Sequence, residues 1–313
     1  MPRKFLKEVM MADELAFDID PPAQSGECVR VSPLVRRIVA NNPGAITFTG
    51  TCTYIVGSGH VAIIDPGPDL PEHIDALLDA VRGETVTHVL VTHTHKDHSP
   101  AARAIQAATG AKLVGCGPHR SARPLSIGEV NFLEASSDKD YVPDQELVEG
   151  DVIEGPGWRL EALTTPGHMA NHLAFSLPEE NALFSGDHVM AWSTTVIAPP
   201  DGSMGDFMAS LEKLRGRDET LYWPGHGGPV REPQRFVRAL AHHRRQREVS
   251  ILNRLAAGDR TIPEIVAAIY QGLKPALIGA AGLSVFAHLE DLIAKGQVAT
   301  EGLPSLDSEY RLA

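Results

Sequence analysis

The chain has 313 residues, 43% of them hydrophobic, which is enough to bury one large core and a second, smaller one. Its net charge of −12 comes from the front of the chain, since residues 231–313 alone carry 11 basic and 9 acidic side chains. An acidic front disfavours broad electrostatic binding of nucleic acid. The three scattered cysteines are not spaced for a disulfide framework or a zinc knuckle.

The N-terminal region does not show the pattern of an exported protein. Acidic residues between Glu8 and Asp20 interrupt any apolar run of the kind that a secretory segment needs. No stretch reaches the uninterrupted apolar length that spans a bilayer. We therefore expect a cytoplasmic protein without a membrane partner, in which residues 1–27 form a loosely attached leader.

Residues 28–232 alternate strand and helix patterns, as an α/β domain does. Short β-branched runs at 51–56 and 60–64, separated by Gly57-Ser-Gly59, predict a hairpin. Apolar residues at helical spacing predict a helix at 71–81. The further predicted elements are a strand at 86–92, a helix at 100–109, and strands at 111–115, 158–164, 172–176 and 182–185. This order favours two mixed sheets with helices outside, an αββα sandwich.

Residues 233–313 have the pattern of a small helical domain. A long helix with a basic face is predicted at 233–255, and Thr261-Ile-Pro-Glu264 is a capping box that opens a second helix. A third helix is predicted at 276–295, followed by two short strands at 297–301 and 309–312. Three helices and a β-hairpin are the pattern of a winged helix.

Three imidazoles and a carboxylate lie within six residues, His93-Thr-His95-Lys-Asp97-His98, directly after a predicted strand. Zinc takes nitrogen and oxygen ligands in a near-tetrahedral arrangement, and alternate residues of an extended segment point to one side. His93 and His95 can therefore hold one ion, and Asp97 and His98 can reach a second. Surface histidines with Asp97 as a helix cap are the alternative, which so dense a polar cluster disfavours.

Three further candidate ligands each follow a strand and a tight glycine-containing turn. They are His168 in Thr-Thr-Pro-Gly-His, Asp187 in Phe-Ser-Gly-Asp, and His226 in Trp-Pro-Gly-His. Such turns at the edge of a rigid sheet present ligands to a shared point.

In this order, the motifs HTHKDH, TPGH, SGDH and PGHG resemble the signature of the metallo-β-lactamase superfamily, over roughly residues 30–230. The resemblance implies a dinuclear hydrolase with two Zn²⁺ ions per chain and a metal-bridging hydroxide. It implies that the first ion is bound by His93, His95 and His168, the second by Asp97, His98 and His226, with Asp187 bridging both. Asp97 is also expected to act in catalysis, by orienting the hydroxide and accepting a proton.

Three neighbouring residues have less certain roles. Asp65 matches the aspartate that steadies the ligand loop in the family, and a simple turn aspartate is an equal alternative. His172 often lines the substrate side in this family, so it is a candidate catalytic residue for substrate contact or proton transfer, or it only packs. His188 is expected to point away from the metals.

The sequence is compatible with two classes of substrate. With its winged helix and only 38 residues between Asp187 and His226, the chain resembles lactamase-β-like endoribonucleases, which cleave single-stranded RNA. Arg244, Arg245 and Arg247 would then contact phosphodiesters, although a solvated helix face is the alternative for them.

The other class is a small-molecule thioester or ester hydrolase of the glyoxalase II type. Lactone or β-lactam hydrolysis is less expected, because true β-lactamases of this fold generally lack the bridging aspartate. The apolar segment 191–205 is expected to form a substrate wall or a packed loop. The C-terminal domain is expected to cover the rim of the site or to mediate homo-oligomerisation.

Overall fold

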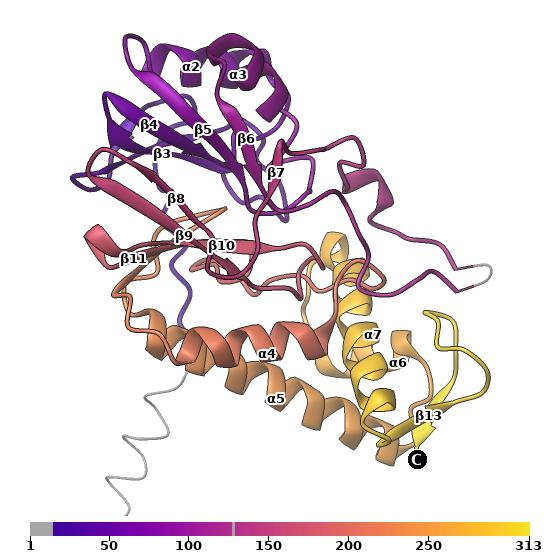
Figure 1. The fold of residues 1–313 in the computed structure, drawn as a ribbon. Coiled ribbons are helices and arrows are strands. Elements are labelled where there is room, and N and C mark those ends of the chain that lie inside the picture. Colours follow the sequence, from indigo (N-terminus) through magenta and orange to yellow (C-terminus); the bar gives the residue numbers. More distant parts are fainter. Residues whose placement is uncertain (1–14, 127–128) are drawn as a thin grey trace, which may run out of the picture.

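Two β-sheets lie face to face and carry helices on their outer surfaces (Figure 1). The computed structural model describes residues 15–126 and 129–313. The first sheet has seven strands in the order β1-β2-β3-β4-β5-β6-β7. These strands are β1 (Val29–Arg30), β2 (Val35–Val39), β3 (Cys52–Ser58), β4 (His60–Ile64), β5 (Thr85–Val91), β6 (Lys112–Gly115) and β7 (Gln145–Glu146).

The second sheet has five strands in the order β12-β11-β10-β9-β8. They are β8 (Val152–Gly155), β9 (Trp158–Thr164), β10 (Leu173–Leu177), β11 (Ala182–Gly186) and β12 (Leu221–Pro224). The sheets meet closely at Trp158, whose indole Nε1 donates a hydrogen bond to the carbonyl oxygen of His60 at 2.9 Å. Gly57 is required here, because its φ is +100° and a Cβ would lie 2.4 Å from that indole nitrogen.

The helices complete the predicted αββα sandwich. Helices α2 (Pro71–Ala80) and α3 (Ala102–Thr109) cover the outer face of the first sheet, and α4 (Met204–Arg215) and α5 (Pro233–Ala257) cover that of the second (Figure 1). The predicted helices and strands of this region are confirmed to within a few residues. The strands β1, β2, β7 and β8 were not predicted, since they are short; β2 also contains two arginines, of which Arg37 is buried and donates to the Pro22 carbonyl oxygen.

Helix α4 was not predicted, and only its first two residues fall in the segment 191–205 that was expected to form a substrate wall or a packed loop. Its N-cap is Ser203, whose hydroxyl accepts a hydrogen bond from the backbone N–H of Asp206. Phe207, Leu211 and Leu214 are buried on one face, against the second sheet. That cap followed by apolar residues four and three apart is a signal for a helix, which the preceding proline and glycine residues obscured.

The C-terminal part has the predicted winged-helix order. Helix α6 (Ile262–Ile269) begins at the predicted capping box of Thr261 and Glu264, and α7 (Ile278–Ala294) leads to the antiparallel strands β13 (Val298–Thr300) and β14 (Tyr310–Leu312). By length and composition alone, Pro275–Ala294 is apolar enough to cross a bilayer, although Glu290 and Asp291 interrupt its apolar run. Half of this segment is buried, and it forms the centre of a small core with α6.

Helix α5 belongs to two hydrophobic cores. Its first half contributes Val237 and Leu240 to the core beneath the second sheet, and its second half contributes Ile251 and Leu255 to the C-terminal core. A continuous 25-residue helix therefore connects the sandwich and the winged helix. This connection fixes the position of the C-terminal part beside the sandwich.

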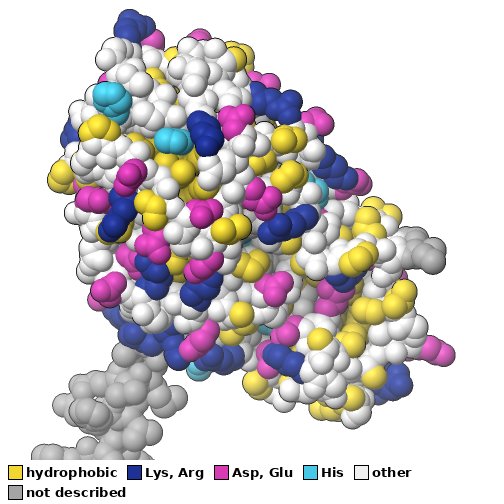
Figure 2. Space-filling view, in the orientation of Figure 1, with side chains coloured by type: hydrophobic (Ala, Val, Ile, Leu, Met, Phe, Trp, Pro, Cys, Tyr) yellow, Lys and Arg dark blue, Asp and Glu magenta, His cyan; other side chains and the backbone are white. Residues whose placement is uncertain are grey.

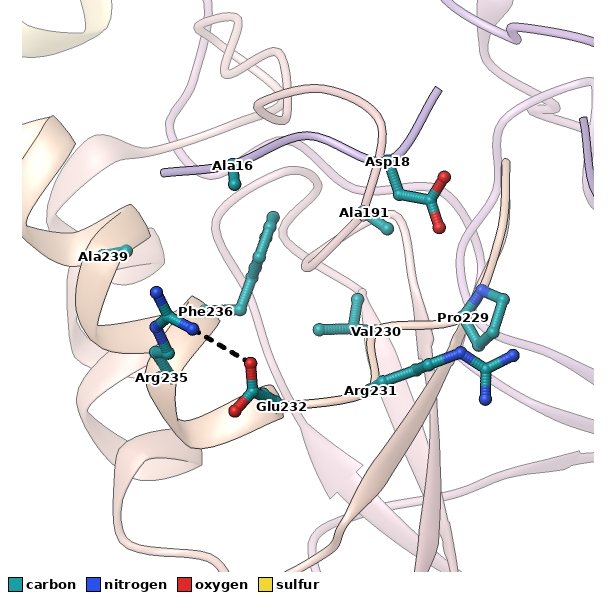
Figure 3. Close-up of a pocket in the computed structure, with 10 residues that line it drawn as sticks. All are labelled: Ala16, Asp18, Ala191, Pro229, Val230, Arg231, Glu232, Arg235, Phe236 and Ala239. Carbon is teal, nitrogen blue, oxygen red and sulfur yellow. Dashed lines mark hydrogen bonds and ion pairs between the residues drawn. The ribbon is translucent and has the colours of Figure 1, made fainter. Parts of the chain in front are cut away.

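The leader is held more firmly than predicted in the part that the structure describes. Asp18 donates its backbone N–H to the carbonyl oxygen of Ala191 at 2.9 Å. Ala16 and Asp18 lie beside Phe236 of α5 and line a cavity of about 250 Å³ (Figure 3). Residues 15–27 are thus attached to the domain by backbone hydrogen bonds and apolar contacts. The remainder of the predicted leader, residues 1–14, lies outside the described residues.

Candidate metal centre

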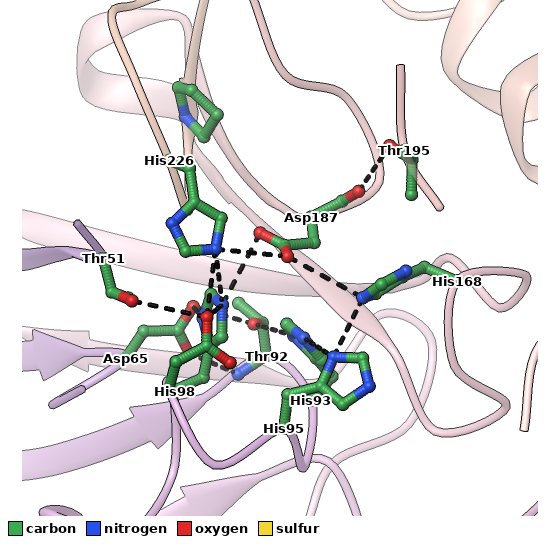
Figure 4. Close-up of polar contacts among 12 residues, drawn as sticks. Thr51, Asp65, Thr92, His93, His95, His98, His168, Asp187, Thr195 and His226 are labelled. Carbon is green, nitrogen blue, oxygen red and sulfur yellow. Dashed lines mark hydrogen bonds and ion pairs between the residues drawn. The ribbon is translucent and has the colours of Figure 1, made fainter. Parts of the chain in front are cut away.

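The predicted ligand residues converge at one edge of the two sheets (Figure 4). His93 to His98 follow β5, Asp187 follows β11, and His226 follows β12. The ends of β11 and β12 are adjacent because those strands pair in parallel, and the Gly225 N–H donates to the Gly186 carbonyl oxygen at 2.8 Å. Gly225 must lack a side chain, since a Cβ would lie 2.4 Å from Asp187 Oδ1. All seven residues expected to bind metal fall into three overlapping groups of potential ligands.

The first set of ligands is formed by His93, His95 and His168. The Nδ1 atom of His95 lies 3.1 Å from Nε2 of His93 and 3.0 Å from Nε2 of His168. Asp187 Oδ2 lies 3.7 Å from Nε2 of His168. Ligands of a tetrahedral zinc ion stand about 3.4 Å from one another, given metal–ligand bonds of about 2.0–2.1 Å. The spacing of these atoms therefore fits one metal ion.

The second set is formed by Asp97, His98 and His226. Nε2 of His226 lies 3.2 Å from Asp97 Oδ2 and 3.4 Å from both Nε2 of His98 and Asp187 Oδ2. Asp187 thus lies between the two sets, as a bridging ligand would. Its Oδ1 atom is buried and has no hydrogen-bond partner among the described residues, as expected for an oxygen that faces a cation.

The ring nitrogens that face away from the centre are held by fixed acceptors. Nδ1 of His168 lies 2.7 Å from the Val196 carbonyl oxygen, and Nδ1 of His226 lies 3.2 Å from the Gly50 carbonyl oxygen. A carbonyl oxygen only accepts hydrogen bonds, so each Nδ1 carries a proton, and it is Nε2 that presents a lone pair to the centre when the ring is neutral. The protein therefore sets the tautomer that metal binding requires.

Asp65 fixes His98 and the end of β5 together. Its Oδ2 lies 2.9 Å from Nδ1 of His98 and accepts the Thr92 hydroxyl at 2.8 Å. Its Oδ1 accepts the backbone N–H of Thr92, also at 2.8 Å. Asp65 adopts a φ of +49°, which aspartate and asparagine tolerate better than most residues. Of the two roles expected for Asp65, these contacts favour support of the ligand loop.

The two ligand sets differ in charge. Burial lowers the pKa of His95 to about 3, so this imidazole is neutral and ready to ligate. Burial also acts to lower the pKa of His226, but the Asp187 and Asp97 carboxylates raise it to about 10. In the metal-free protein the second set is therefore a buried ion pair, and a metal ion must displace a proton to bind there.

His172 lies behind the bridging carboxylate instead of facing a substrate. Its Nε2 accepts the backbone N–H of Asp187 at 3.1 Å, and its Nδ1 lies 2.8 Å from the Thr165 hydroxyl. Both ring nitrogens are thus engaged, and the ring is buried. This placement differs from the expected substrate-facing role and makes His172 a positioning residue for Asp187. His188 points away from the metals, as predicted, and its ring packs on Phe207 with centroids 4.4 Å apart.

A cavity of about 830 Å³ opens onto the metal ligands. Its metal end is lined by His95, Asp97, His168, Asp187 and His226. Its other walls are mainly apolar and come from several parts of the chain: Ile46 and Thr47; Phe132, Leu133, Ala135 and Ser136; Met190 and Val196; and the C-terminal residues Ile262, Pro263, Gly279, Ala280, Gly282, Leu283, Leu306 and Asp307. The C-terminal domain therefore covers the rim of the site, as expected. Of the predicted loop wall 191–205, only Val196 lines this cavity.

The three arginines of the basic run in α5 have different surroundings in the structure. The Arg244 side chain is only 3% exposed and donates to the Thr195 carbonyl oxygen. The guanidinium of Arg247 lies over the Tyr270 ring, 4.3 Å from its centroid, whereas Arg245 is exposed. Burial lowers the pKa of Arg244 to about 10. The expected contact of Arg244 with a phosphodiester is therefore corrected, since its side chain is enclosed between α5 and the loop behind Asp187.

Comparisons with known proteins agree with this architecture. The family model of the "Metallo-beta-lactamase superfamily" matches residues 46–226, and that of the "Beta-lactamase associated winged helix domain" matches residues 261–305. The chain is 31% identical over 259 residues to the "Atrochrysone carboxyl ACP thioesterase" of Aspergillus terreus, covering 77% of this chain and 73% of that protein. It is also 31% identical over 234 residues to the "Beta-lactamase-like protein 2 homolog" of Caenorhabditis elegans, covering 71% of each.

Solved structures share the fold over nearly the whole chain. A beta-lactamase domain protein from Burkholderia ambifaria superimposes with a TM-score of 0.77 at 21% identity, covering 96% of this chain and 97% of that one. The metallo-beta-lactamase family protein TTHA1429 from Thermus thermophilus has a TM-score of 0.71 at 23% identity, covering 91% and 100%. The expected kinship with endoribonucleases is supported only at the level of the superfamily, since these relatives are described as thioesterase or lactamase-like proteins. The chain belongs to the metallo-beta-lactamase superfamily of hydrolases and carries the beta-lactamase-associated winged helix domain at its C-terminal end.

Proposed function

We propose that this hydrolase cleaves thioesters of large apolar acyl groups with two zinc ions. The observation that carries the proposal is the cavity of about 830 Å³, which has metal ligands at one end and apolar walls beyond them. Pockets that enclose drug-sized ligands have about 300–1,000 Å³ and are mostly apolar, with a few polar groups at the reacting end. The thioesterase name of one relative supports the same substrate class.

The ligand geometry supports two metal ions. Each of the two sets has three ligands of its own, and Asp187 is within reach of both. When bound, zinc supplies a water of lowered pKa and polarises the substrate carbonyl. Asp97 and Asp187 both line the cavity, and Asp97 is the more exposed carboxylate, with 25% of its side chain exposed against 8% for Asp187. The Asp97 carboxylate orients the attacking water and accepts the proton that this water loses.

RNA cleavage receives less support from the surface. Among the described residues that line the cavity, Lys96 is the only lysine or arginine, so a phosphodiester backbone would meet a single cation there. On the face drawn in Figure 2, basic and acidic side chains are interspersed and form no broad basic area. The buried Arg244 removes one of the three arginines expected to contact phosphates.

The test is turnover of the zinc-loaded protein on decanoyl-N-acetylcysteamine thioester and on a fluorescent single-stranded RNA. We expect the thioester to be hydrolysed and the RNA to stay intact. The His95→Ala variant should lose more than about 100-fold in kcat/KM, because it lacks a metal ligand. His60→Ala is the matched control, since His60 is exposed and remote from the ligand groups. Cleavage of RNA that is absent in His95→Ala, with the thioester untouched, would contradict the proposal.

A further inference from the structure

The C-terminal domain forms part of the wall of the cavity above the metal centre. This part of the wall lies where α6 and α7 begin, and includes Ile262, Gly279, Gly282 and Leu283. Residues 132–136 of the sandwich form another part of the wall. A group that reacts at the metal centre and fills this cavity therefore contacts the start of α7.

The backbone conformation does not require glycine at Gly279 or Gly282 of this wall. Both belong to α7, and neither has a positive φ. Glycine destabilises a helix relative to alanine, so its presence there needs a reason. Elsewhere in the chain the reason is contact, as at Gly225, where a Cβ would lie 2.4 Å from Asp187 Oδ1.

Packing does not explain these glycines either. A Cβ added at Gly279 would have no heavy atom within 4 Å. One added at Gly282 would meet only Cγ2 of Ile262, at an ordinary van der Waals distance of 3.7 Å. Gly279 is exposed and Gly282 is half-buried, and both line the cavity, so a larger side chain at either position can extend into it.

The wall is held in place by polar contacts on its other side. Ser284 of α7 accepts a hydrogen bond from Nη1 of the buried Arg244 at 3.4 Å. Glu290 of α7 pairs with Arg123 at 2.5 Å, which ties the helix to the segment that precedes residues 132–136. A wall anchored to both α5 and the sandwich can set a size limit, because a larger ligand cannot push it aside without breaking these contacts.

We propose that the start of α7, at Gly279 and Gly282, is the part of this enzyme that selects its substrates by the size of the acyl group. This inference rests on the proposed thioester hydrolysis and names its specificity element. At roughly 30 Å³ per heavy atom, the volume of a water molecule in the liquid, the cavity of about 830 Å³ accommodates on the order of 25 heavy atoms. The preferred substrate is therefore a thioester of a long or multi-ring apolar acid, whose far end lies against α7.

The test compares acyl lengths in binding and in turnover. Binding of acetate, hexanoate and decanoate to the zinc-loaded protein is measured by calorimetry, and hydrolysis is measured with the matching N-acetylcysteamine thioesters. Each buried methylene contributes about 0.8 kcal/mol, or about fourfold, so decanoate should bind on the order of 200-fold more tightly than hexanoate if all four extra methylenes are enclosed.

Three variants report on the wall. Gly279→Leu should reduce the preference for decanoate over hexanoate at least tenfold, both in Kd and in kcat/KM, while the acetyl thioester stays within about twofold. The Gly279→Ala variant should have a preference for decanoate that lies between those of the unaltered protein and Gly279→Leu. Because alanine favours the helix, this variant guards against a failure to fold. Ala276→Leu is the matched control, because Ala276 is exposed and does not line the cavity.

The outcomes separate this inference from the function on which it rests. Equal binding of hexanoate and decanoate, or a Gly279→Leu variant that behaves like Ala276→Leu, would overturn the role of α7 even if thioesters are hydrolysed. Tight decanoate binding that is lost in Gly279→Leu, without hydrolysis of any thioester, would support the wall and overturn the thioester assignment alone.

Discussion

Replacement of Asp65 by asparagine tests how the protein prepares the second ligand set. The carboxylate of Asp65 accepts three hydrogen bonds, from the Thr92 backbone, the Thr92 hydroxyl and Nδ1 of His98. Asparagine has one accepting oxygen and one donating nitrogen. If its oxygen keeps the backbone N–H of Thr92, its amide nitrogen faces His98, whose Nδ1 must then accept. The proton moves to Nε2 of His98, and the lone pair that binds metal is lost.

The expected magnitude follows from the position of Asp65 outside the ligand set. Loss of such a supporting group typically weakens metal binding 10–100-fold, which is about 1.4–2.7 kcal/mol. The effect should fall on the set of Asp97, His98 and His226, while the other set keeps its affinity. The backbone should tolerate the change, because asparagine also adopts the φ of +49° observed at Asp65.

The assay is a zinc titration of the metal-free protein against a chromophoric chelator, with bound metal counted by mass spectrometry. Asp65→Asn should retain one tight equivalent and show a second that is 10–100-fold weaker. Asp201→Asn is the matched control, since Asp201 is also buried but accepts hydrogen bonds from Ser121 and Asn131 instead of a metal ligand. Two unchanged affinities in a folded Asp65→Asn protein would refute the reasoning.

Three more predictions concern the bridge, the acid response and the buried arginine. Asp187→Ala should bind about one zinc ion fewer per chain and lose activity; full turnover with a single ion would exclude a dinuclear mechanism. His288 is buried, neither of its ring nitrogens is hydrogen-bonded to any residue that the structure describes, and burial lowers its pKa to about 3. Below pH 6.5 the unfolded chain therefore binds a proton that the folded chain does not, so the free energy of unfolding decreases by about 1 kcal/mol for each pH unit by which the pH is lowered from 6.5 to 5. Urea unfolding of His288→Leu between pH 6.5 and 5 should show a slope smaller by that amount, and an unchanged slope would count against it. Arg244→Ala should lower the free energy of unfolding by about 2–4 kcal/mol, because it leaves the Thr195 carbonyl oxygen unpaired. The exposed Arg245→Ala should stay within about 0.5 kcal/mol, and equal effects of the two would refute the assignment.

The metal ligands could be predicted from the sequence because their signal is local. His93 to His98 form a dense run after a strand, and His168, Asp187 and His226 each follow a glycine-containing turn. The support given by Asp65 was visible only through a resemblance, since 27 residues separate it from Thr92. The resemblance was misleading for His172, because an imidazole at a strand end can face either the cavity or the backbone behind Asp187.

The cavity could not be predicted, because its walls come from segments that are distant along the chain. Ile46, Phe132 and Gly279 meet only after the sandwich and the C-terminal domain have packed. The burial of Arg244 was missed for a similar reason. A run of basic residues on a helix indicates solvent exposure, and only the packing of α4, α7 and the Thr195 loop against α5 shows that Arg244 is enclosed.

The parallel pairing of β11 and β12 has a consequence for how the protein exchanges its metal. The Gly225–Gly186 hydrogen bond that joins the two strand ends needs no ion, and the ring nitrogens of His168 and His226 are oriented by backbone carbonyl oxygens. Removal of the metal therefore leaves the ligand atoms close to their final positions. Renewed metal binding then requires only that an ion enters and a proton leaves, and no loop has to refold. Zinc uptake should accordingly be limited by the supply of free ion, and a brief shortage of metal should leave a protein that recovers as soon as the ion returns.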